Sequence, residues 1–241
     1  MIKYKLRNAF INYMRSKNIF ISRNENLSDS QILAFIKSNL VQNGKSVLHI
    51  GAHDGQEAKY YCSLGVSVLW IEAQPEVFLR LERNIRDYLP KQSAKCVLLG
   101  NENLSGVKFY LSNNGTVSSS IYDFGSDAPW AGIRMSETIE LNMERLDHLY
   151  SPNDFKDFSH CVIDVQGAEL IVLQGFGDIL HQFNSFQIEI STMETYSGGV
   201  QFSEIYSFLK KYNFEPLWLP RDGTHQDLIF LKTNHIFRVS L

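Results

Sequence analysis

Short apolar runs alternate with amphipathic segments from residue 44 to the end of the chain. The apolar runs predict strands at 46–50, 67–71, 95–99, 160–165 and 186–190, because short uninterrupted apolar segments are typical of strands covered on both faces. Apolar side chains at helical spacing predict helices between them, at 56–63, 75–88, 168–175 and 202–212. This alternation favours an α/β, doubly wound, Rossmann-like fold in which right-handed crossovers build a mostly parallel sheet.

Four further segments complete the predicted sheet structure. Segments 107–111 and 138–143 alternate between apolar and polar residues, so they could pair as half-buried strands on either side of a polar loop at 112–120. Two final strands are predicted at 214–219 and 227–232, joined by a few residues with turn chemistry. So short a connection requires an antiparallel pair, which we expect at one edge of the sheet.

The first 43 residues differ in charge from the rest. Residues 1–27 carry six lysine and arginine residues against one acid, Glu25, and their apolar residues fall near helical spacing. Residues 28–43 predict a second helix. We therefore divide the chain into a basic, helical N-terminal extension (1–43) and a main domain (44–241). The extension is expected to dock on the main domain, or to contact an anionic membrane surface or acceptor.

Composition narrows the broad class of protein. The chain has 241 residues, 44% of them hydrophobic, and a formal net charge of −3, so its charge gives no reason to expect nucleic-acid binding. The three cysteines (Cys62, Cys96 and Cys161) are widely spaced and odd in number, which favours free thiols in a cytoplasmic protein. We expect Cys96 and Cys161 to be buried. No apolar run approaches the roughly 18 residues of a membrane-spanning helix.

Candidate chemistry is expected where ligands bind to such sheets, beyond the carboxyl ends of the parallel strands. The first predicted strand runs into a turn with Gly51 and Gly55, and glycines there allow a ligand to approach the backbone closely. Glu72 ends the second strand, 21 residues after Gly51. An acid in that place can accept hydrogen bonds from the ribose hydroxyls of an adenosine ligand, although it could also be an ordinary surface residue.

Asp54 helps to separate two classes of adenosine cofactor. A dinucleotide would place its pyrophosphate at the start of the helix after the first turn, where the Asp54 carboxylate would repel it. S-adenosylmethionine carries a sulfonium cation and an amino group, both of which tolerate a nearby acid. The methyl donor is therefore favoured over NAD, while an NAD-linked oxidoreductase remains the first alternative.

More acids follow the fourth and fifth strands. Asp164 ends the fourth strand, Gln166 follows it, and Glu169 falls in the first turn of the next helix. Glu169 could act in catalysis or simply stabilise the helix start. Glu189 alternates with apolar neighbours in the fifth strand, so it either faces the cleft or pairs with a cation.

Taken in order, several motifs give the chain a family resemblance. They are IGAHDGQ (50–56), WIEAQPEVFLRLERNI (70–85), the serines 118–120, Leu146-Asp147, IDVQGAELIVLQG (163–175) and QIEIS (187–191). The segment from Val47 to Leu231 thereby resembles the FkbM-type methyltransferases, a branch of the class I enzymes that use S-adenosyl-L-methionine.

The resemblance implies a seven-stranded sheet whose last strands are antiparallel. It also implies O-methylation of a hydroxyl, often on a sugar in a glycan such as a surface polysaccharide, or on a natural product. It also implies donor contacts at Gly51, Gly55 and Glu72, with Asn101 or Glu102 near the adenine. We further expect Ala52, Asp54, Ala73, Ser119, Asp164 and Gln166 at the donor site. His49 stands where the family usually has an acid, and it can still accept a hydrogen bond from the donor.

The expected mechanism is orientation of the acceptor oxygen, together with removal of its proton by a general base. We predict Asp164 as this base, with His53 and Glu189 as reserves. A divalent metal held by Asp164 and Glu189 is an alternative, but no ligand spacing supports it, so no metal is expected. A binding protein without catalytic activity is the second alternative to a methyltransferase, and His49 is its best support.

Overall fold

The computed structural model describes residues 46–89, 91–126, 128, 131–217, 219–220, 223 and 225–233, and the backbone alone at 20–21 and 238–239. Phe20–Ile21 form β1, which pairs in parallel with β12 (Arg238–Val239). The remainder of the predicted N-terminal extension, 1–43, lies outside the described residues.

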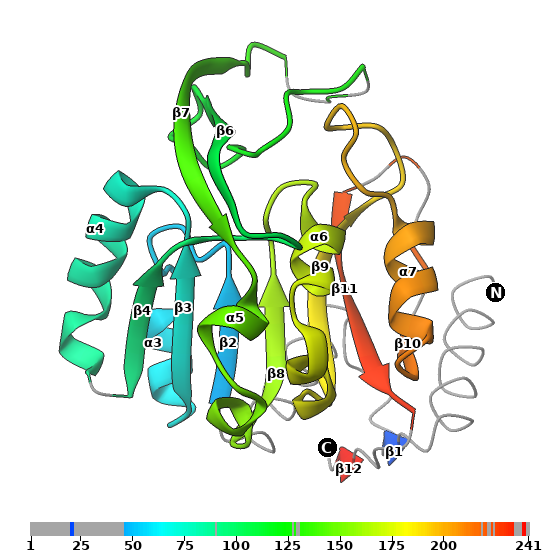
Figure 1. Ribbon diagram of the computed structural model, residues 1–241. Coiled ribbons are helices and arrows are strands. Elements are labelled where there is room, and N and C mark those ends of the chain that lie inside the picture. The colour runs from blue at the N-terminus through cyan, green and yellow to red at the C-terminus, as the bar shows by residue number, and fades with distance from the viewer. Residues whose placement is uncertain are drawn as a thin grey trace, which may run out of the picture.

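A seven-stranded sheet forms the centre of the molecule (Figure 1). Its order is β10 (Phe214–Pro216), β11 (His225–Lys232), β9 (Ser185–Ser191), β8 (Phe158–Ile163), β2 (Ser46–Ile50), β3 (Ser67–Glu72) and β4 (Gln92–Cys96). Five adjacent strands of this sheet, β4, β3, β2, β8 and β9, are parallel. By contrast, β11 runs antiparallel to both β9 and β10. The predicted mostly parallel, Rossmann-like sheet with an antiparallel last strand is confirmed.

Helices cover both faces of this sheet, as doubly wound topology requires. On one face α3 (Ala58–Ser63) and α4 (Pro75–Ile85) pack against Val47, Val68 and Trp70. On the other lie α5 (Leu146–Leu149), α6 (Glu169–Gln174) and α7 (Phe202–Lys210), with the short 3-10 helices η2 (Pro152–Phe155) and η3 (Gly177–Gln182). A third 3-10 turn, η1 (Arg86–Tyr88), follows α4.

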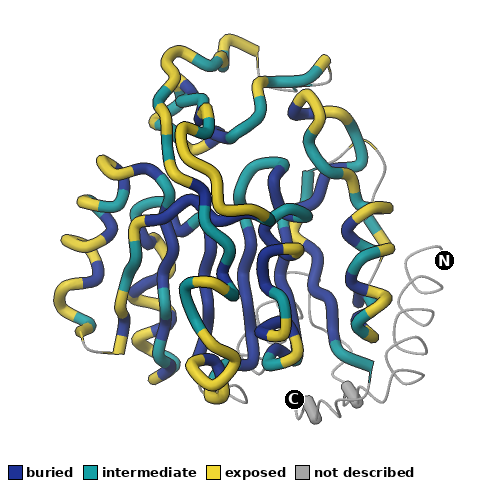
Figure 2. Tube along the Cα trace, viewed as in Figure 1, coloured by how far each residue is buried: buried dark blue, intermediate teal, exposed yellow. Residues whose placement is uncertain are grey.

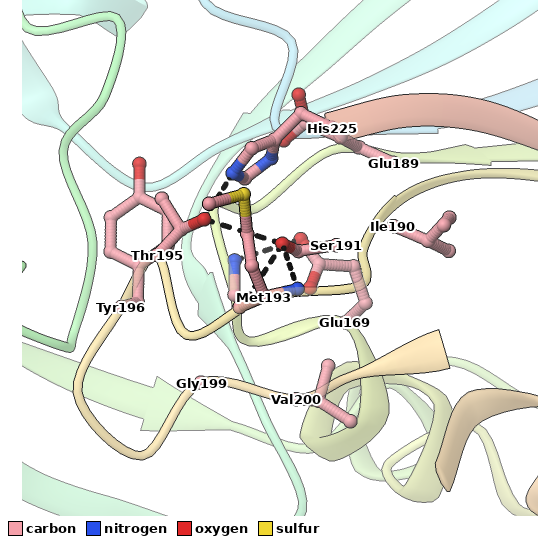
Figure 3. Close-up of a pocket in the computed structure, with 11 residues that line it drawn as sticks. Glu169, Glu189, Ile190, Ser191, Met193, Thr195, Tyr196, Gly199, Val200 and His225 are labelled. Atoms are coloured by element: carbon pink, nitrogen blue, oxygen red, sulfur yellow. Dashed lines mark hydrogen bonds between the residues drawn. The ribbon is translucent and has the colours of Figure 1, made fainter. Parts of the chain in front are cut away.

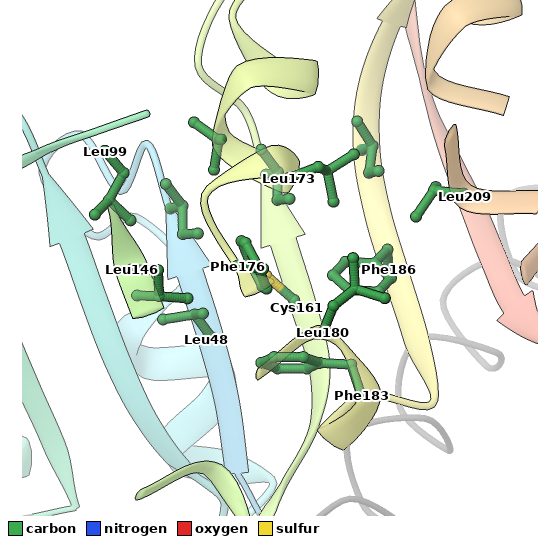
Figure 4. Packing of buried hydrophobic residues seen from close by; sticks show 14 of the residues in the cluster. Leu48, Leu99, Leu146, Cys161, Leu173, Phe176, Leu180, Phe183, Phe186 and Leu209 are labelled. Carbon is green, nitrogen blue, oxygen red and sulfur yellow. The ribbon is translucent and has the colours of Figure 1, made fainter. Parts of the chain in front are cut away.

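The larger core lies under α5, α6 and α7 and is built around phenylalanine rings (Figure 4). Phe176, Phe183 and Phe186 are fully buried, with ring centroids 5.4 to 5.9 Å apart. These side chains and the inward residues of β2 and β8 fix the sheet, so the loops at the carboxyl ends of the strands stand on a rigid base.

A second, smaller sheet rises beyond the carboxyl ends of the parallel strands (Figure 1). It consists of β5 (Leu98–Leu99), β6 (Leu104–Ser112) and β7 (Met135–Glu144), and β6 and β7 form the predicted antiparallel pair. The single strand predicted at 95–99 is two strands, because the chain leaves β3 after Cys96 and pairs with β7 from Leu98. The hairpin is more exposed than the central strands (Figure 2).

The three cysteines are free thiols, as predicted. Cys161 is buried, but the predicted burial of Cys96 is wrong, since this residue ends the edge strand β4 and is exposed. Among the helices of the described residues, none is long and apolar enough to cross a membrane.

Candidate active site

The turn after β2 packs tightly against the end of β8. Gly51 has a φ of +78°, and a Cβ built on it would lie 1.7 Å from the backbone oxygen of Asp164. The amides of Gly51 and Ala52 both donate to the oxygen of Ile71 in β3, at 3.0 Å. Only glycine suits this position, because its conformation and the close approach of β8 both exclude a side chain.

Glu72 occupies the end of β3 beside this turn and is only 4% exposed. Its carboxylate accepts hydrogen bonds from the backbone amides of His53 (2.9 Å) and Gln74 (2.8 Å). Burial raises the pKa of Glu72, and the two amides act against that rise. Since each carboxylate oxygen has more than one acceptor position, the side chain can still accept hydrogen bonds from a ligand.

An open cavity of about 580 Å³ lies at this edge of the sheet. Gly51, Glu72 and Asp164 line its walls at the ends of β2, β3 and β8, and Ala73, Ser119 and Gln166 also line it. An apolar strip of Leu98, Leu99, Phe109 and Ile121 forms another side. The loop between β6 and β7 forms the roof of the cavity, so the small sheet covers the cavity on that side.

Two contacts join the roof to the glycine turn and to the start of α4. His53 Nε2 lies 3.3 Å from the oxygen of Gly115, and Gln74 Nε2 donates to the oxygen of Thr116 at 3.5 Å. Thr116 lines the cavity, and its buried Oγ1 has no hydrogen-bond partner among the described residues. A hydroxyl in that position is available to a ligand, because a buried polar group without a partner is costly.

Four polar side chains meet at the ends of β8 and β9. Gln166 Nε2 donates to Asp164 Oδ1 at 2.6 Å and to Glu189 Oε2 at 2.7 Å. The Tyr196 hydroxyl donates to Gln166 Oε1 at 2.6 Å. This pattern fixes the orientation of the amide, because only its NH₂ group can donate to two carboxyl groups.

The two carboxyl groups of this cluster also share a hydrogen bond with each other. Burial raises the pKa of both, and the pKa of Glu189 lies well above its usual range because the Asp164 charge adds to its burial. The hydrogen bonds from Gln166 and Glu189 lower the pKa of Asp164. The arrangement therefore favours a proton on Glu189 over one on Asp164, because the pKa of Glu189 is raised further.

Glu169 has a structural role at the start of α6. It is 2% exposed, and its Oε1 accepts hydrogen bonds from the amides of Val165 (3.2 Å) and Gly167 (3.0 Å). Burial raises its pKa to about 7, although these amides act in the opposite direction. Glu169 thus fixes the loop that carries Gln166, whose own φ is +58°.

A second, smaller cavity of about 270 Å³, open on one side, adjoins this cluster (Figure 3). Glu189, Tyr196 and His225 line it, together with Ser191 at the end of β9 and Met193 and Thr195 just after that strand. Hydrogen bonds connect the Thr195 hydroxyl to His225 Nε2 and to the Ser191 hydroxyl (Figure 3). Tyr196, which follows β9, lines this cavity and donates to Gln166, which lines the larger one.

Several residues predicted at the donor site do not line the larger cavity. His49 points to the opposite face of the sheet, where it stacks on Trp70 with ring centroids 4.8 Å apart. The carboxamide of Asn101 donates to Gln174, and Glu102 is exposed. Among the described residues it is Leu98 and Leu99, just before these two, that reach the cavity.

Three other predicted residues shape the glycine turn without lining the cavity. Ala52 is buried in the core beneath α3. Asp54 Oδ1 lies 3.3 Å from His53 Nδ1, but the two atoms do not meet the geometry of a hydrogen bond. A Cβ on Gly55 would lie 2.6 Å from Leu81, so this glycine lets α4 pack against the turn. His53 itself lines the cavity.

The residues present fit S-adenosylmethionine better than a dinucleotide. The described lining of the larger cavity includes the acids Glu72 and Asp164 and contains no lysine or arginine. A sulfonium and an ammonium group suit such a lining, whereas a pyrophosphate would lack a cationic partner. The apolar strip offers a flat surface for a purine. No group of three His, Cys, Asp or Glu side chains in the described part of the chain could hold a metal ion.

A seven-stranded sheet of this order, with its cavity at the carboxyl ends of the parallel strands, is the fold of S-adenosylmethionine-dependent methyltransferases. A model of the methyltransferase FkbM domain matches residues 49–216. The chain therefore belongs to the FkbM methyltransferase family, whose fold usually binds S-adenosylmethionine. This assignment supports the methyl donor over NAD.

Solved structures with a similar fold are distant in sequence. They include an uncharacterized protein from Listeria monocytogenes serotype 4b (10% identity over 86% of this chain and 68% of that chain, TM-score 0.46). An rRNA methylase from Streptococcus thermophilus is 10% identical over 87% of this chain and 98% of that chain, with a TM-score of 0.45. The methyltransferase domain of bacterial CtHen1-C is 12% identical over 84% of this chain and 95% of that chain, with a TM-score of 0.45. No curated protein sequence matches the chain. Structures this distant in sequence give no information about the substrates of this chain.

Proposed function

We propose that the protein transfers a methyl group from S-adenosylmethionine to a hydroxyl oxygen, and that the acceptor is a sugar in a glycan or a natural product. One observation carries the proposal. A buried acid, Glu72, and a second acid, Asp164, face one cavity from the ends of β3 and β8, on either side of β2 and its Gly51 turn, with no lysine or arginine in its described lining.

Each wall of the cavity has a separate task in this proposal. Glu72 binds the ribose hydroxyls of the donor, and Leu98, Leu99 and Phe109 contact its adenine. The Thr116 hydroxyl offers a further hydrogen bond from the roof. When bound, S-adenosylmethionine supplies a methyl group that its sulfonium already makes electrophilic, so the protein has to orient the acceptor rather than activate the methyl group.

Asp164 is the general base. A sugar hydroxyl has a high pKa and must lose its proton as the new bond to oxygen forms. Hydrogen bonds from Gln166 and Glu189 favour the charged form of Asp164, because they lower its pKa against the rise that burial causes. Glu189 therefore acts through Asp164, and Gln166 holds both carboxyl groups in position. His53, tied to the roof and to Glu72, is better placed to shape the donor site than to take a proton.

Donor binding tests the proposal directly. In the Glu72→Gln variant an NH₂ group replaces one carboxylate oxygen, so one of the two backbone amides loses its acceptor. We expect the affinity for S-adenosylhomocysteine, measured by isothermal titration calorimetry, to fall at least tenfold. Glu76→Gln is the matched control, because Glu76 is an exposed acid in the first turn of α4.

Two results would contradict the proposal. One is equal affinity of the Glu72→Gln variant and the wild-type protein for S-adenosylhomocysteine. The other is binding of NAD by the wild-type protein with no binding of S-adenosylhomocysteine.

A further inference from the structure

The loop that roofs the larger cavity is built as one compact unit. Residues 113–120, which we call the roof loop, follow β6. Side chains close its base, since the Ser112 hydroxyl accepts from the amide of Ser118 at 3.1 Å and the Asn114 carboxamide donates to the Ser118 hydroxyl at 2.9 Å. The amide of Ser112 donates to the Ser119 hydroxyl at 3.0 Å. A loop closed in this way moves as one piece, so a contact made at its tip also affects its base.

The tip of the roof loop, Gly115 and Thr116, lies beside Glu72. The two residues whose amides hold the Glu72 carboxylate, His53 and Gln74, also contact the tip with their side chains. His53 Nε2 is 3.3 Å from the oxygen of Gly115, and Gln74 Nε2 is 3.5 Å from that of Thr116. Both distances are long for a hydrogen bond, so these contacts are weak. The tip is therefore close to the place proposed for the ribose, but it is held there loosely.

Two features of Thr116 indicate a functional role. Its buried hydroxyl lines the cavity without a partner in the described part of the chain, which is unfavourable unless a ligand provides one. Its φ of +67° lies in the left-handed region, which a β-branched residue adopts only at a cost. Of the four described non-glycine residues with a positive φ, three line this cavity: His53, Thr116 and Gln166. Backbone strain of this kind concentrates at ligand clamps and active sites.

The base of the roof loop contacts the residues around Asp164 instead. The Ser120 hydroxyl donates to the backbone oxygen of Gln166 at 2.7 Å. The Tyr196 hydroxyl, which donates to the Gln166 side chain, is also 3.2 Å from the backbone oxygen of Ser118. Ser120 is fully buried and is absent from the described lining of both cavities, so it acts on a ligand only through Gln166. Because Gln166 donates to Asp164, the position of the roof loop affects the orientation of that carboxylate.

We propose that the roof loop is a clamp that couples donor binding to the placement of Asp164. Thr116 donates its hydroxyl to an oxygen or a ring nitrogen of the donor's nucleoside, and this contact fixes the tip of the loop. Ser120 is a positioning residue, since it holds Gln166 against the base of the loop. The general base is thereby placed for proton transfer only when the methyl donor is present. The proposal rests on the proposed methyltransferase function and adds a means of regulation to it.

The Thr116→Val variant tests the clamp, because valine has nearly the same shape and the same β-branching but no hydroxyl. We expect the affinity for S-adenosylhomocysteine, measured by isothermal titration calorimetry, to fall about three- to tenfold. The melting temperature of the donor-free protein should be unchanged or higher, since a hydroxyl without a partner is removed. Thr138→Val is the matched control, because Thr138 is exposed in β7 and lines neither cavity. Equal affinity of Thr116→Val and wild type would overturn the clamp.

A double-mutant cycle tests the coupling between the tip and the base of the loop. Ser120→Ala removes the hydrogen bond to Gln166. The loss of affinity for S-adenosylhomocysteine that Thr116→Val causes should be at least threefold smaller in the Ser120→Ala background than in wild type. Ser136→Ala is the control background, because this exposed serine also donates to a backbone oxygen, that of Leu111. There the full effect of Thr116→Val is expected.

The outcomes of the cycle can be told apart. If Ser120 had only a structural role, Ser120→Ala would lower the melting temperature but leave the effect of Thr116→Val unchanged, and the coupling would be refuted. Ser120→Cys keeps the size of the side chain and replaces Ser120→Ala if the alanine variant does not fold. Failure of the wild-type protein to bind S-adenosylhomocysteine would remove the methyltransferase proposal itself, whereas normal binding by wild type with additive variants removes the clamp alone.

Discussion

The two ends of the larger cavity hold their acids in different ways. At the end of β3, two backbone amides hold the Glu72 carboxylate, one from Gln74, two residues on, and one from His53, 19 residues earlier. At the ends of β8 and β9, side chains hold the acids instead, since Gln166 donates to both Asp164 and Glu189 and itself accepts from Tyr196.

This difference matches the two tasks that we propose. Backbone amides cannot exchange protons with a carboxylate, so they keep Glu72 fixed as an acceptor of hydrogen bonds. Side chains can share a proton, and the carboxyl groups of Asp164 and Glu189, which both accept a hydrogen bond from Gln166 Nε2, are placed to do so. The first end is therefore suited to binding, and the second to chemistry.

Removing the charge of Asp164 is the strongest test of the proposed difference between the two ends of the cavity. We expect Asp164→Asn to reduce turnover by about 10²- to 10⁴-fold, the usual contribution of a general base. Donor affinity, measured with S-adenosylhomocysteine, should change by only a few-fold. The control is Asp178→Asn, because Asp178 is exposed in η3, away from both cavities. Unchanged turnover in Asp164→Asn would remove Asp164 from the role of base.

Glu169 lies at the second end, but backbone amides hold its carboxylate, as they hold that of Glu72. Its response to pH tests whether it behaves like Glu72 or like Asp164 and Glu189. Its pKa is about 7 in the folded protein and near 4.5 when unfolded, so the folded protein binds more protons between these values. Stability therefore decreases as pH rises from about 4.5 to about 7, and the loss is of the order of 3 kcal/mol.

The Glu169→Gln variant isolates this contribution. Glutamine keeps an oxygen for the amides of Val165 and Gly167 but has no charge to bury. In urea unfolding at pH 8 we expect the variant to be more stable than wild type by about 3 kcal/mol, and at pH 4 the two should be nearly equal. A difference that does not change with pH would contradict the buried charge.

The smallest effect that we expect comes from a test of the role of Tyr196. Tyr196→Phe removes the hydrogen bond that orients the Gln166 amide, a loss of about two- to tenfold in turnover. Because that amide lowers the pKa of Asp164, the acid limb of the pH–rate profile should move to higher pH. Tyr60→Phe, at a 40% exposed tyrosine in α3, is the control. Reduced turnover with an unchanged pH profile would indicate a purely structural role.

The sequence predicted the sheet well and placed Gly51 and Glu72 at the ends of adjacent strands, because both depend on local patterns. Uninterrupted apolar runs identified the central strands, and the distance from Gly51 to Glu72 reflects one strand–helix–strand unit. Residues 95–99 show the limit of this approach. Their apolar character continues across Cys96 and Val97, although the chain changes from one sheet to another there.

The rest of the site depends on contacts between residues far apart in the sequence, which no local sequence pattern predicts. The sequence brought Asp164 and Gln166 together, but the bonds of Gln166 to Glu189 and Tyr196 appear only when distant loops meet. His49 was misplaced for a simpler reason. Side chains alternate along a strand, and the neighbours of His49 face the core under α5 and α6, so His49 itself faces Trp70.

The way in which the β6–β7 hairpin leaves and rejoins the main sheet has a consequence for how such enzymes can diversify. The chain leaves the main sheet after Cys96, and Leu99 and Glu144, on either side of the hairpin, are paired neighbours. Insertions or deletions between them can reshape the covering of the site while the seven central strands keep their register. The covering that includes Phe109 and Thr116 can thus vary, while Gly51, Glu72 and Asp164 keep their places at the strand ends.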